Sequence, residues 1–254
     1  MVNVLINGAN GRMGKKVFEA CSLSNTVKAV CGVDIKEDLT NSNYPVYSGF
    51  DSVQEKVDVV VDFSSPVCLD NILSFCKKLG IPAVLCSTGY TDSDVDKIKS
   101  ASEEIAIFRS GNMSLGVNLL VDLVKKAAAT LCGFDVEIIE KHHNQKVDAP
   151  SGTALMLADG VKEVQTDKFY TYGREGIVGK RDQKEIGIHA VRGGTIVGEH
   201  DVIFAGNFET VTLSHQATDR SVFANGAVAA ANFIADKKSG LYNMSDVINS
   251  RQNA

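Results

Sequence analysis

A strand that runs directly into a glycine-rich turn and a helix constrains the fold of this chain more than any other feature. Val2–Asn7 is an apolar run typical of a buried strand, and Gly8–Gly14 follows it, with a helical pattern through Cys21. Glycines allow a backbone to approach a pyrophosphate closely, and a helix start offers unpaired N–H groups and the positive end of its dipole. The feature therefore predicts the first unit of a Rossmann-type domain that binds a dinucleotide.

Asp34 adds to this signal and bears on the choice of cofactor. The glycines are spaced G-x-x-G-x-x-G, which departs from the usual G-x-G-x-x-G and is a weak signal alone. Asp34 ends the second expected strand, 20 residues after Gly14, where a carboxylate would accept hydrogen bonds from the adenosine ribose. The carboxylate of Asp34 would repel the 2′-phosphate of NADPH, so it favours NADH as the cofactor. Lys36 could pair with that phosphate, so use of both NADH and NADPH stays open.

The alternation of strands and helices continues to about residue 113, which predicts a parallel sheet with helices on both faces. Ser87-Thr88-Gly89 and Arg109–Met113 follow expected strands at the carboxyl edge, where doubly wound sheets bind ligands. We expect the first of these segments on the nicotinamide side of the cofactor; the alternative is a plain polar turn. The expected strands are 2–7, 27–33, 57–62, 81–86 and 105–108, with a helix at 66–79 that ends at Gly80.

Beyond residue 113 the pattern changes to a long amphipathic helix, 115–132, followed mainly by strands. This predicts a second domain of α+β type with a mostly antiparallel sheet. We place a dinucleotide-binding domain at 1–113 and a substrate-binding and oligomerisation domain at 114–221. The segment 222–254, with a last alanine-rich helix, is expected to pack back on the first domain, whose five strands need cover on both faces. The strands expected in the second domain are 134–140, 186–191, 195–197, 202–205 and 208–215, with hairpin turns at Gly193-Gly194 and Gly206-Asn207 and a surface loop at 165–184.

Residues 140–154 combine more titratable and anion-binding groups than any other stretch. The apolar run Phe134–Ile139 predicts a strand that delivers His142, His143 and Lys146 to its polar end. Neighbouring side chains on a strand point to opposite sides, so one histidine can face a substrate while the other faces the core or a second subunit. The alternative for each histidine is a solvated or hydrogen-bonded residue without a catalytic role.

Ser151-Gly152-Thr153 begins a helical pattern after this block. The unpaired N–H groups of a helix start, with two hydroxyls beside them, form a site for a carboxylate or phosphate, and Lys146 adds a positive charge. The alternative is that Ser151 only caps the helix. A metal site is disfavoured, because neighbouring histidines diverge and the chain has neither His-x-x-x-His nor Cys-x-x-Cys spacing.

The composition describes an ordinary globular protein of 254 residues, 44% hydrophobic and 22% charged. No apolar run reaches the length of a membrane span and no basic leader precedes the first strand, so we expect a cytoplasmic protein without a membrane partner. The six cysteines lack paired spacing and are expected to be reduced thiols. A net charge of −5 without a Lys/Arg stripe argues against binding to nucleic acid.

Three blocks, in their order and spacing, resemble the 4-hydroxy-tetrahydrodipicolinate reductase (dihydrodipicolinate reductase) family: Gly8–Gly14, Glu140–Ala154 and Phe223–Ala227. The resemblance covers essentially the whole chain, and the block His-His-x-x-Lys-x-Asp-Ala-Pro-Ser-Gly-Thr is highly specific. It implies an enzyme of the diaminopimelate and lysine route, in which a cyclic dicarboxylate loses water and the resulting conjugated imine accepts hydride from NADH or NADPH. It also implies a homotetramer built through the sheet of the second domain.

The resemblance further implies roles for single residues. His142 would be the proton donor and acceptor and Lys146 the second acid, while His143 and the backbone of Gly152 and Thr153 would hold a substrate carboxylate. The family often has Gly-Thr-Thr-Gly at residues 86–89 and Asn-Phe-Ser at 112–114, and these departures bear on the fine cofactor preference. The residues implied to contact the cofactor are Gly8, Ala9, Asn10, Gly11, Arg12, Met13, Asp34, Cys86, Ser87, Thr88, Ser110, Gly111, Asn112 and Met113.

Two other functions stay open on the sequence alone. One is another two-domain NAD(P)-dependent dehydrogenase that acts on a small carboxylate, a sugar or a semialdehyde, and a panel of substrates would separate it. The other is a regulator that senses NAD(H) without chemistry, for which His142 and Lys146 would be dispensable. A pure sensor has no need of acids beside an anion site, which favours an enzyme.

Overall fold

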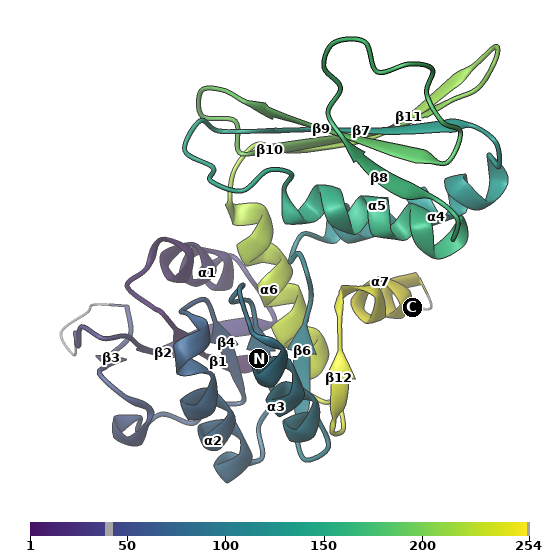
Figure 1. Ribbon diagram of the computed structural model, residues 1–254. Helices are drawn as coiled ribbons and strands as arrows, with labels where there is room; N and C mark the ends of the chain where they lie inside the picture. Colours follow the sequence, from purple (N-terminus) through teal and green to yellow (C-terminus); the bar gives the residue numbers. More distant parts are fainter. Residues whose placement is uncertain (39–42, 253–254) are drawn as a thin grey trace. The chain divides into compact units, whose positions relative to one another are not determined.

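The computed structural model describes residues 1–38 and 43–252. The chain forms two compact units (Figure 1): Met1–Leu115 together with Arg220–Ala254, and Gly116–Asp219. The last two residues of the C-terminal segment 222–254 lie outside the described residues. Among the described helices, none combines the length and the apolar character that a membrane crossing requires.

The first unit is built on a sheet in the strand order β12-β6-β5-β4-β1-β2-β3. All neighbouring strands pair in parallel, as the alternating pattern predicts. β3 and β12 lie at the two edges, beyond the five predicted strands, and each is too short to give a periodic signal. The strands are β1 Val2–Asn7, β2 Val27–Val33, β3 Val46–Tyr47, β4 Val59–Asp62, β5 Ala83–Leu85, β6 Ala106–Arg109 and β12 Gly240–Tyr242.

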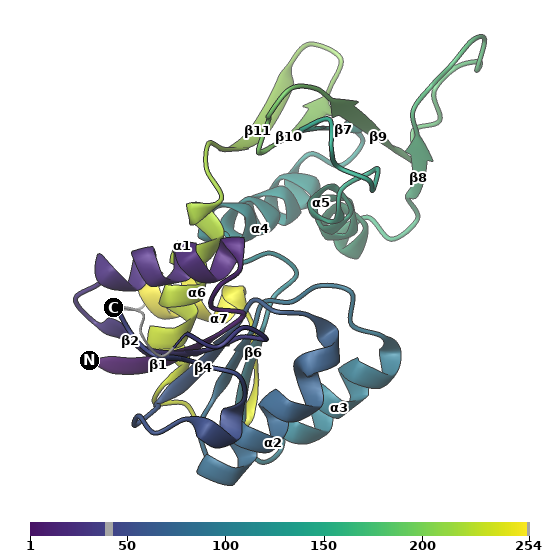
Figure 2. The same cartoon turned by 90° about the vertical axis from the view of Figure 1, so that its left-hand side faces the viewer.

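Helices cover both faces of this sheet (Figure 2). Val4 and Ile6 of β1 share a core with α1 and α6, whereas Leu5 between them shares a core with α2 and α3 on the other face. This two-sided burial explains why the central strands are nearly continuous apolar runs. The helices are α1 Arg12–Ser22, α2 Leu69–Leu79, α3 Asp92–Ser102, α6 Ser221–Ile234 and α7 Met244–Gln252, with short 3-10 turns at Phe50–Ser52 and Pro66–Cys68.

Local chemistry sets the ends and the packing of these helices. Gly80 adopts φ +64 as the left-handed cap of α2, as predicted. Thr91 and Asp94 form a capping box at the start of α3. α6 approaches the backbone of the first unit closely, since a Cβ at Gly226 would lie 1.6 Å from the carbonyl oxygen of Met113. The C-terminal segment therefore packs on the sheet formed by the start of the chain.

The second unit holds a sheet in the order β11-β10-β7-β9-β8, with α4 and α5 on one face (Figure 1). β10 pairs antiparallel with β11 and β7, whereas β9 pairs parallel with β7 and β8. The α+β class is confirmed, and the sheet is mixed where the sequence predicts mostly antiparallel pairing. The reason is that α5 follows β7 and returns the chain to the edge of the sheet at which β7 starts. β8 and β9 can therefore run in the same direction as β7. The elements are α4 Leu115–Thr130, β7 Asp135–His142, α5 Gly152–Val164, β8 Phe169–Tyr172, β9 Glu185–Arg192, β10 Gly198–Ala205 and β11 Thr210–Ala217.

Two segments of the second unit differ from the prediction. Thr195–Val197 is not a strand and Gly193-Gly194 is not a hairpin turn, because β7 lies between β9 and β10 and the connection must pass it. The segment 165–184, expected as a surface loop, contains β8, whose Phe-Tyr-Thr-Tyr sequence has high strand propensity. The hairpin at Gly206-Asn207 is confirmed, and the Gly206 N–H donates to the Glu209 carbonyl oxygen at 2.9 Å between β10 and β11.

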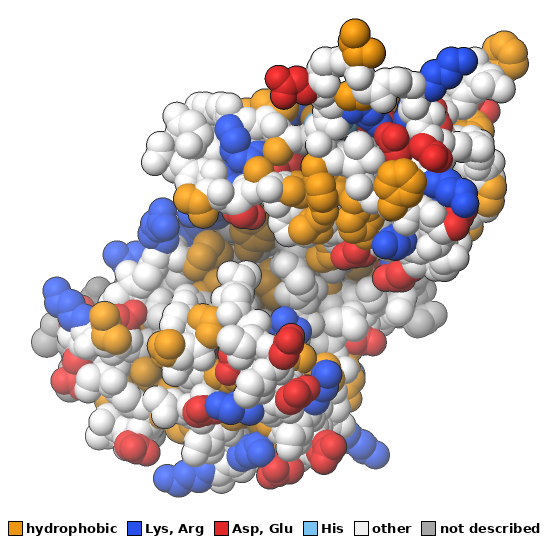
Figure 3. Space-filling view, viewed as in Figure 1, with side chains coloured by type: hydrophobic (Ala, Val, Ile, Leu, Met, Phe, Trp, Pro, Cys, Tyr) orange, Lys and Arg blue, Asp and Glu red, His pale blue; other side chains and the backbone are white. Residues whose placement is uncertain are grey.

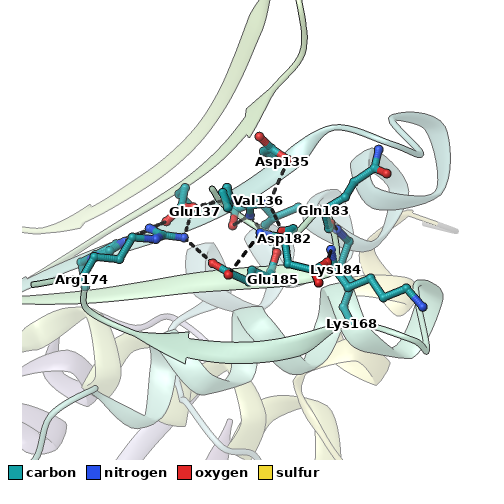
Figure 4. Close-up of polar contacts among 11 residues, drawn as sticks. Asp135, Val136, Glu137, Lys168, Arg174, Asp182, Gln183, Lys184 and Glu185 are labelled. Carbon is teal, nitrogen blue, oxygen red and sulfur yellow. Dashed lines mark hydrogen bonds and ion pairs between the residues drawn. The ribbon is translucent and has the colours of Figure 1, made fainter. Parts of the chain in front are cut away.

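Two arginines, Arg174 and Arg181, clamp the connection between β8 and β9 to the sheet, and Figure 4 shows Arg174 beside Glu137 and Glu185. Arg174 donates to Glu137 of β7 at 2.9 and 3.0 Å and to Glu185 of β9 at 2.8 Å. Arg181 donates to the same Glu137 at 2.9 Å. Burial alone would raise the pKa of Glu137, but hydrogen bonds from Arg174, Arg181 and His189 lower it to about 2. Glu137 is therefore ionised and fixes this connection on one face of the sheet.

Candidate functional site

Only glycine fits at Gly8, in the turn between β1 and α1, and at Gly14, in the first turn of α1. Gly8 has φ +80, and a Cβ there would lie 2.9 Å from the carbonyl oxygen of Phe63. A Cβ at Gly14 would lie 2.2 Å from the carbonyl oxygen of Gly8. α1 can therefore pack directly on the turn and begin beside the carboxyl end of β1.

The start of α1 is arranged to receive an anion. Its N-cap is Gly11, which has no side chain to cap the helix, and its first turn carries no acidic residue. Arg12 follows with an exposed side chain. Backbone N–H groups at the positive end of the helix dipole, with a guanidinium nearby, suit a pyrophosphate.

Asp34 lies against the same turn. Its Oδ2 accepts a hydrogen bond from the Asn10 N–H at 2.9 Å, and Oδ1 accepts one from the Lys36 N–H at 3.4 Å. The side-chain amide of Asn10 donates to the carbonyl oxygen of Lys36 at 2.7 Å. The segment after β2 is thus tied to the glycine turn, and the carboxylate of Asp34 lies beside that turn.

A cavity of about 670 Å³ adjoins this edge of the sheet. Gly8, Gly11 and Asp34 line it, together with Ile35 and Val67, which are 99% and 89% exposed. These two side chains offer apolar surface for a flat ring, with polar groups at the edge to orient it. The first unit therefore fits a dinucleotide by both charge and shape.

Asp62, which the sequence pattern does not single out, organises the carboxyl ends of three strands. It is fully buried at the end of β4. Its oxygens accept hydrogen bonds from the Asn7 side chain at 2.8 Å, the Ser64 N–H at 3.0 Å and the Ser87 hydroxyl at 2.7 Å. In sequence Asp62 is only the last residue of an apolar run. Its partners come from the ends of β1, β4 and β5, so they become visible only in the folded chain.

The remaining predicted cofactor residues lie at the ends of β5 and β6. These strands are parallel neighbours, so Cys86–Thr88 and Ser110–Met113 follow them at one edge of the sheet. Met113 is 5% exposed within the core. Burial raises the pKa of the Cys86 thiol, which keeps it neutral. At these two positions the backbone, rather than the side chain, is the polar group available to a ligand.

In the second unit, His142 ends β7 and is oriented by Glu140. Its Nδ1 lies 2.7 Å from Oε2 of Glu140, which is fully buried. Burial lowers the pKa of His142, and the interaction with Glu140 partly opposes this, so the ring is neutral near pH 7. His143 follows the strand and is half-buried.

Glu140 is surrounded by donors from three directions. Besides His142, it accepts two hydrogen bonds from Arg192, both at 2.7 Å, and one from the Ser151 N–H at 2.9 Å. Burial alone would raise the pKa of Glu140, but the hydrogen bonds from Arg192, His142 and Ser151 lower it. The sequence pattern singles out neither Glu140 nor Arg192, because the two are 52 residues apart and Glu140 resembles the polar end of a strand.

Ser151 uses its hydroxyl inside the fold. Its Oγ accepts a hydrogen bond from the Ala154 N–H at 3.2 Å, as N-cap of α5, and lies 2.9 Å from Nε2 of His200. Ser151 and His200 are 2% and 4% exposed. A direct contact between the Ser151 hydroxyl and a substrate, as the sequence suggests, is therefore disfavoured by its burial. The part of the predicted anion site that stays available is the backbone that follows Ser151.

Lys146 and the start of α5 complete the polar group in this unit. The Lys146 ammonium lies 2.8 and 2.9 Å from the two carboxylate oxygens of Asp148. It is also near enough to His142 to lower the pKa of that ring. The first turn of α5 has no acidic residue, Gly152 is exposed, and a Cβ at Gly152 would meet open space. Thr153, next to it, is half-buried.

The predicted residues thus fall into two groups, one in each unit. Gly8–Met13, Asp34 and Lys36 gather around the glycine turn of the first unit, and His142 and Lys146 gather near the start of α5 in the second. Within the described ranges, no group of three or more His, Cys, Asp or Glu side chains is placed to hold a metal ion.

Comparisons with known proteins agree along the whole chain. The N-terminal family model of dihydrodipicolinate reductase matches residues 2–113, and the C-terminal model matches 116–248. The 4-hydroxy-tetrahydrodipicolinate reductase of Caldanaerobacter subterraneus subsp. tengcongensis is 49% identical over 98% of both chains. That of Clostridium novyi is 46% identical over 99% of this chain and 100% of its own. A solved structure, a dipicolinate-bound dihydrodipicolinate reductase from Paenisporosarcina sp. TG-14, has a TM-score of 0.80 at 27% identity, over 96% of this chain and 97% of that one.

Burial of His200 predicts how stability changes with pH. Burial lowers its pKa from 6.5 to about 4, so between these values the unfolded chain binds a proton that the folded chain does not. The stability from neutral His200 is complete above about pH 6.5 and is lost as the pH falls toward about 4. Between about pH 7.5 and about pH 5, the free energy of unfolding of the wild type should fall by about 2 kcal/mol more than that of His200→Gln does. Urea unfolding of both proteins at about pH 7.5 and about pH 5 measures this. Equal losses in the two proteins would contradict it.

Proposed function

This chain belongs to the dihydrodipicolinate reductase family, and we propose that it reduces 4-hydroxy-tetrahydrodipicolinate to tetrahydrodipicolinate with hydride from NAD(P)H and loss of water. The reaction is a step of diaminopimelate and lysine biosynthesis. The observation that carries the proposal is the agreement of both family models with near-half identity to named reductases over their whole length.

The first unit binds the pyridine nucleotide, and bound NAD(P)H supplies the hydride. The start of α1 and residues 8–13 hold the pyrophosphate, and the carboxylate of Asp34 accepts hydrogen bonds from the adenosine ribose. Residues 86–88 and 110–113 contact the nicotinamide side. The geometry that supports this is the glycine turn, into which no Cβ fits at Gly8 or Gly14, and the carboxylate tied to it through Asn10.

The second unit binds the substrate, a small cyclic dicarboxylate. The solved relative from Paenisporosarcina holds dipicolinate, a planar ring with two carboxylates. In this chain the backbone at the start of α5, Gly152 and Thr153, together with His143, receives one carboxylate. The exposed start of α5 without an acidic first turn supports this assignment.

His142 and Lys146 manage the protons of the reaction. Departure of the hydroxyl group as water needs an acid, and hydride addition leaves negative charge that must be protonated. The neutral ring of His142 can take up a proton and return it near pH 7, and the Lys146 ammonium is the second acid. The nearness of Lys146 to His142 supports a shared site in this unit.

Lys146 should matter for turnover and not for cofactor affinity. We expect Lys146→Ala to lower kcat by about 100-fold or more, because positioned acids contribute about 10²–10⁴-fold. The Kd for NADH should change less than about threefold, since the nucleotide binds to the other unit. The assay supplies pyruvate and aspartate semialdehyde to the upstream synthase and follows NADH and NADPH loss separately.

Lys141→Ala is the control for this variant. Lys141 lies near the end of β7, before the loop that carries Lys146, and its ammonium pairs with Glu199 and Asp201 at 3.0 and 3.3 Å. It should keep kcat near the wild-type value. Comparable losses of turnover and of NADH affinity in Lys146→Ala would make Lys146 a structural or cofactor residue.

We propose that the chain uses both nucleotides and that Asp34 sets a preference for NADH. Asp34→Asn keeps an oxygen for the Asn10 N–H and removes the charge that repels a 2′-phosphate. The ratio of kcat/KM for NADPH to that for NADH should rise about tenfold, on the order of 1 kcal/mol at a solvated site. Steady-state kinetics with each nucleotide measure this ratio. The control is Glu37→Gln, which removes a nearby exposed charge; an equal change there would show a general charge effect.

We also propose that the chain assembles into a homotetramer through the second unit. Figure 3 shows apolar side chains gathered over α5 and β8, where Val164, Phe169 and Tyr172 are 40%, 44% and 60% exposed. The connection between β8 and β9, which extends beyond the sheet in Figure 2, carries Ile177 and Val178 at 105% and 58% exposure. Exposed apolar surface of this extent is typical of contacts between proteins.

Sedimentation equilibrium tests the assembly. The wild type should have the mass of four chains, and a double variant, Ile177→Asp with Val178→Asp, should dissociate because charge is buried poorly at an apolar contact. Leu23→Asp, which changes a side chain 86% exposed on the first unit, is the control and should keep the assembly. A monomeric wild type would refute the tetramer.

A further inference from the structure

We propose that Glu140, paired with Arg192, is a positioning residue for the reductase reaction: it fixes the tautomer of His142 and the start of α5 together. The kinetic part of this inference rests on the proposed function, whereas the tautomer can be measured without any substrate. Glu140 is fully buried, so it acts through the groups that it holds.

Hydrogen bonding assigns the proton of the His142 ring. Oε2 of Glu140 accepts a hydrogen bond from Nη1 of Arg192 at 2.7 Å and lies 2.7 Å from Nδ1 of His142. A carboxylate paired with a guanidinium is ionised and has no proton to give, so Nδ1–H must be the donor. The other ring nitrogen, Nε2, then carries the lone pair that can accept a proton and return it.

A glycine keeps space open beside that nitrogen. A Cβ at Gly198, the first residue of β10, would lie 3.1 Å from Nε2 and 3.5 Å from Cδ2 of His142. A side chain at this position would crowd the atom that has to exchange the proton. His200, two residues along β10, packs edge-on against His142 with the ring centroids 5.2 Å apart, which restricts rotation of the ring.

The same carboxylate sets the start of α5 and the loop that carries Lys146. Its Oε1 accepts hydrogen bonds from the Ser151 N–H at 2.9 Å and from Nη2 of Arg192 at 2.7 Å. Nη2 also donates to the carbonyl oxygen of Asp148 at 2.7 Å. Ser151 is the N-cap of α5, and the side chain of Asp148 holds the Lys146 ammonium. The ion pair between the buried Glu140 and the half-buried Arg192 thus ties together the imidazole, the ammonium and the proposed carboxylate site.

Charges on every element around His142 bear on its titration. Glu140 on the same strand stabilises the imidazolium, whereas Lys146 from the following loop and Arg192 from β9 oppose it. His200 from β10 is neutral, because burial lowers its pKa to about 4, and the first turn of α5 contributes no acidic group. With Glu140 neutralised, His142 would face two cations and its pKa would fall.

Glu137 offers a matched comparison on the same strand. Like Glu140, it is held by guanidinium groups, here those of Arg174 and Arg181, and its Oε2 lies 2.7 Å from Nε2 of His189. Side chains three positions apart on a strand point to opposite faces, so this cluster lies on the other face of the sheet from His142. A general effect of neutralising a carboxylate on β7 would therefore appear in variants of both residues.

The first measurement uses the wild-type chain without ligand. Imidazole ¹⁵N chemical shifts distinguish the two neutral tautomers, and the chain has five histidines, so the His142 signals can be assigned with single substitutions. At about pH 7.5 His142 should be the Nδ1–H tautomer. An Nε2–H tautomer in the wild type would overturn the proposal, and this holds even if no Glu140 variant folds.

The second measurement compares Glu140→Gln with Glu137→Gln. In Glu140→Gln the pKa of His142 should fall by about one unit or more, and the matching limb of the kcat pH profile should move to lower pH. We expect kcat to fall about 100-fold, as for other orienting residues, with the KM for NADH changed less than about twofold. Glu140→Asp keeps the charge and should bring the pKa of His142 back close to the wild-type value. Glu137→Gln should leave the His142 titration as in the wild type.

The outcomes separate this proposal from the function on which it rests. A merely structural Glu140 would reduce the amount of folded protein without moving the His142 titration, and that result would overturn the proposal. The proposal would also be overturned if Glu137→Gln shifted the pKa of His142 as much as Glu140→Gln does. A wild-type chain that has the Nδ1–H tautomer but no reductase activity would overturn the proposed function instead.

Discussion

The polar site of the second unit depends on keeping one carboxylate ionised out of contact with water. Burying such a charge costs several kcal/mol unless donors surround it. Glu140 has those donors in the guanidinium of Arg192, the imidazole of His142 and the N–H of Ser151. The three come from β9, β7 and the start of α5, so satisfying the charge also fixes these elements relative to one another. The hydrogen bonds that offset the cost of burying Glu140 are therefore the same ones that fix the positions of the groups in the site.

Asp62 is the buried strand-end carboxylate of the first unit. It is fully buried at the carboxyl edge of the parallel sheet, with donors from Asn7, Ser64 and Ser87. These partners stand where β1, β4 and β5 end, next to the turn at Gly8. In both units a buried strand-end carboxylate, the inner group, supports the groups that we propose to contact the ligand, the outer groups. The residue types of the outer groups can then suit the ligand and the reaction, because the inner groups fix the positions of those residues.

The outer groups can be proposed from the sequence, whereas the inner ones cannot. Gly8, Asp34, His142 and Lys146 stand in short motifs whose spacing has a local physical meaning, so they can be recognised without a fold. Asp62 and Glu140 are single acids at the ends of apolar runs, and Arg192 is 52 residues from its partner. The same limit applies to secondary structure. Long periodic segments such as α4 are predicted well, whereas β8 is hidden among charged residues and the parallel pairing of β9 follows only from the path of α5.

The two helix starts differ in a way that matches the ligands that we propose for them. α1 begins at Gly11, which cannot cap it, while α5 begins at Ser151, whose hydroxyl caps it and contacts the buried His200. A dinucleotide is long and is held by many groups along the sheet edge, so no single helix start has to be rigid. A small dicarboxylate has few contacts, and the proposed mechanism requires its reacting atoms to lie against His142 to within a fraction of an ångström. In that mechanism a serine that joins the cap of α5 to Glu140 serves the substrate better by rigidity than by a direct hydrogen bond.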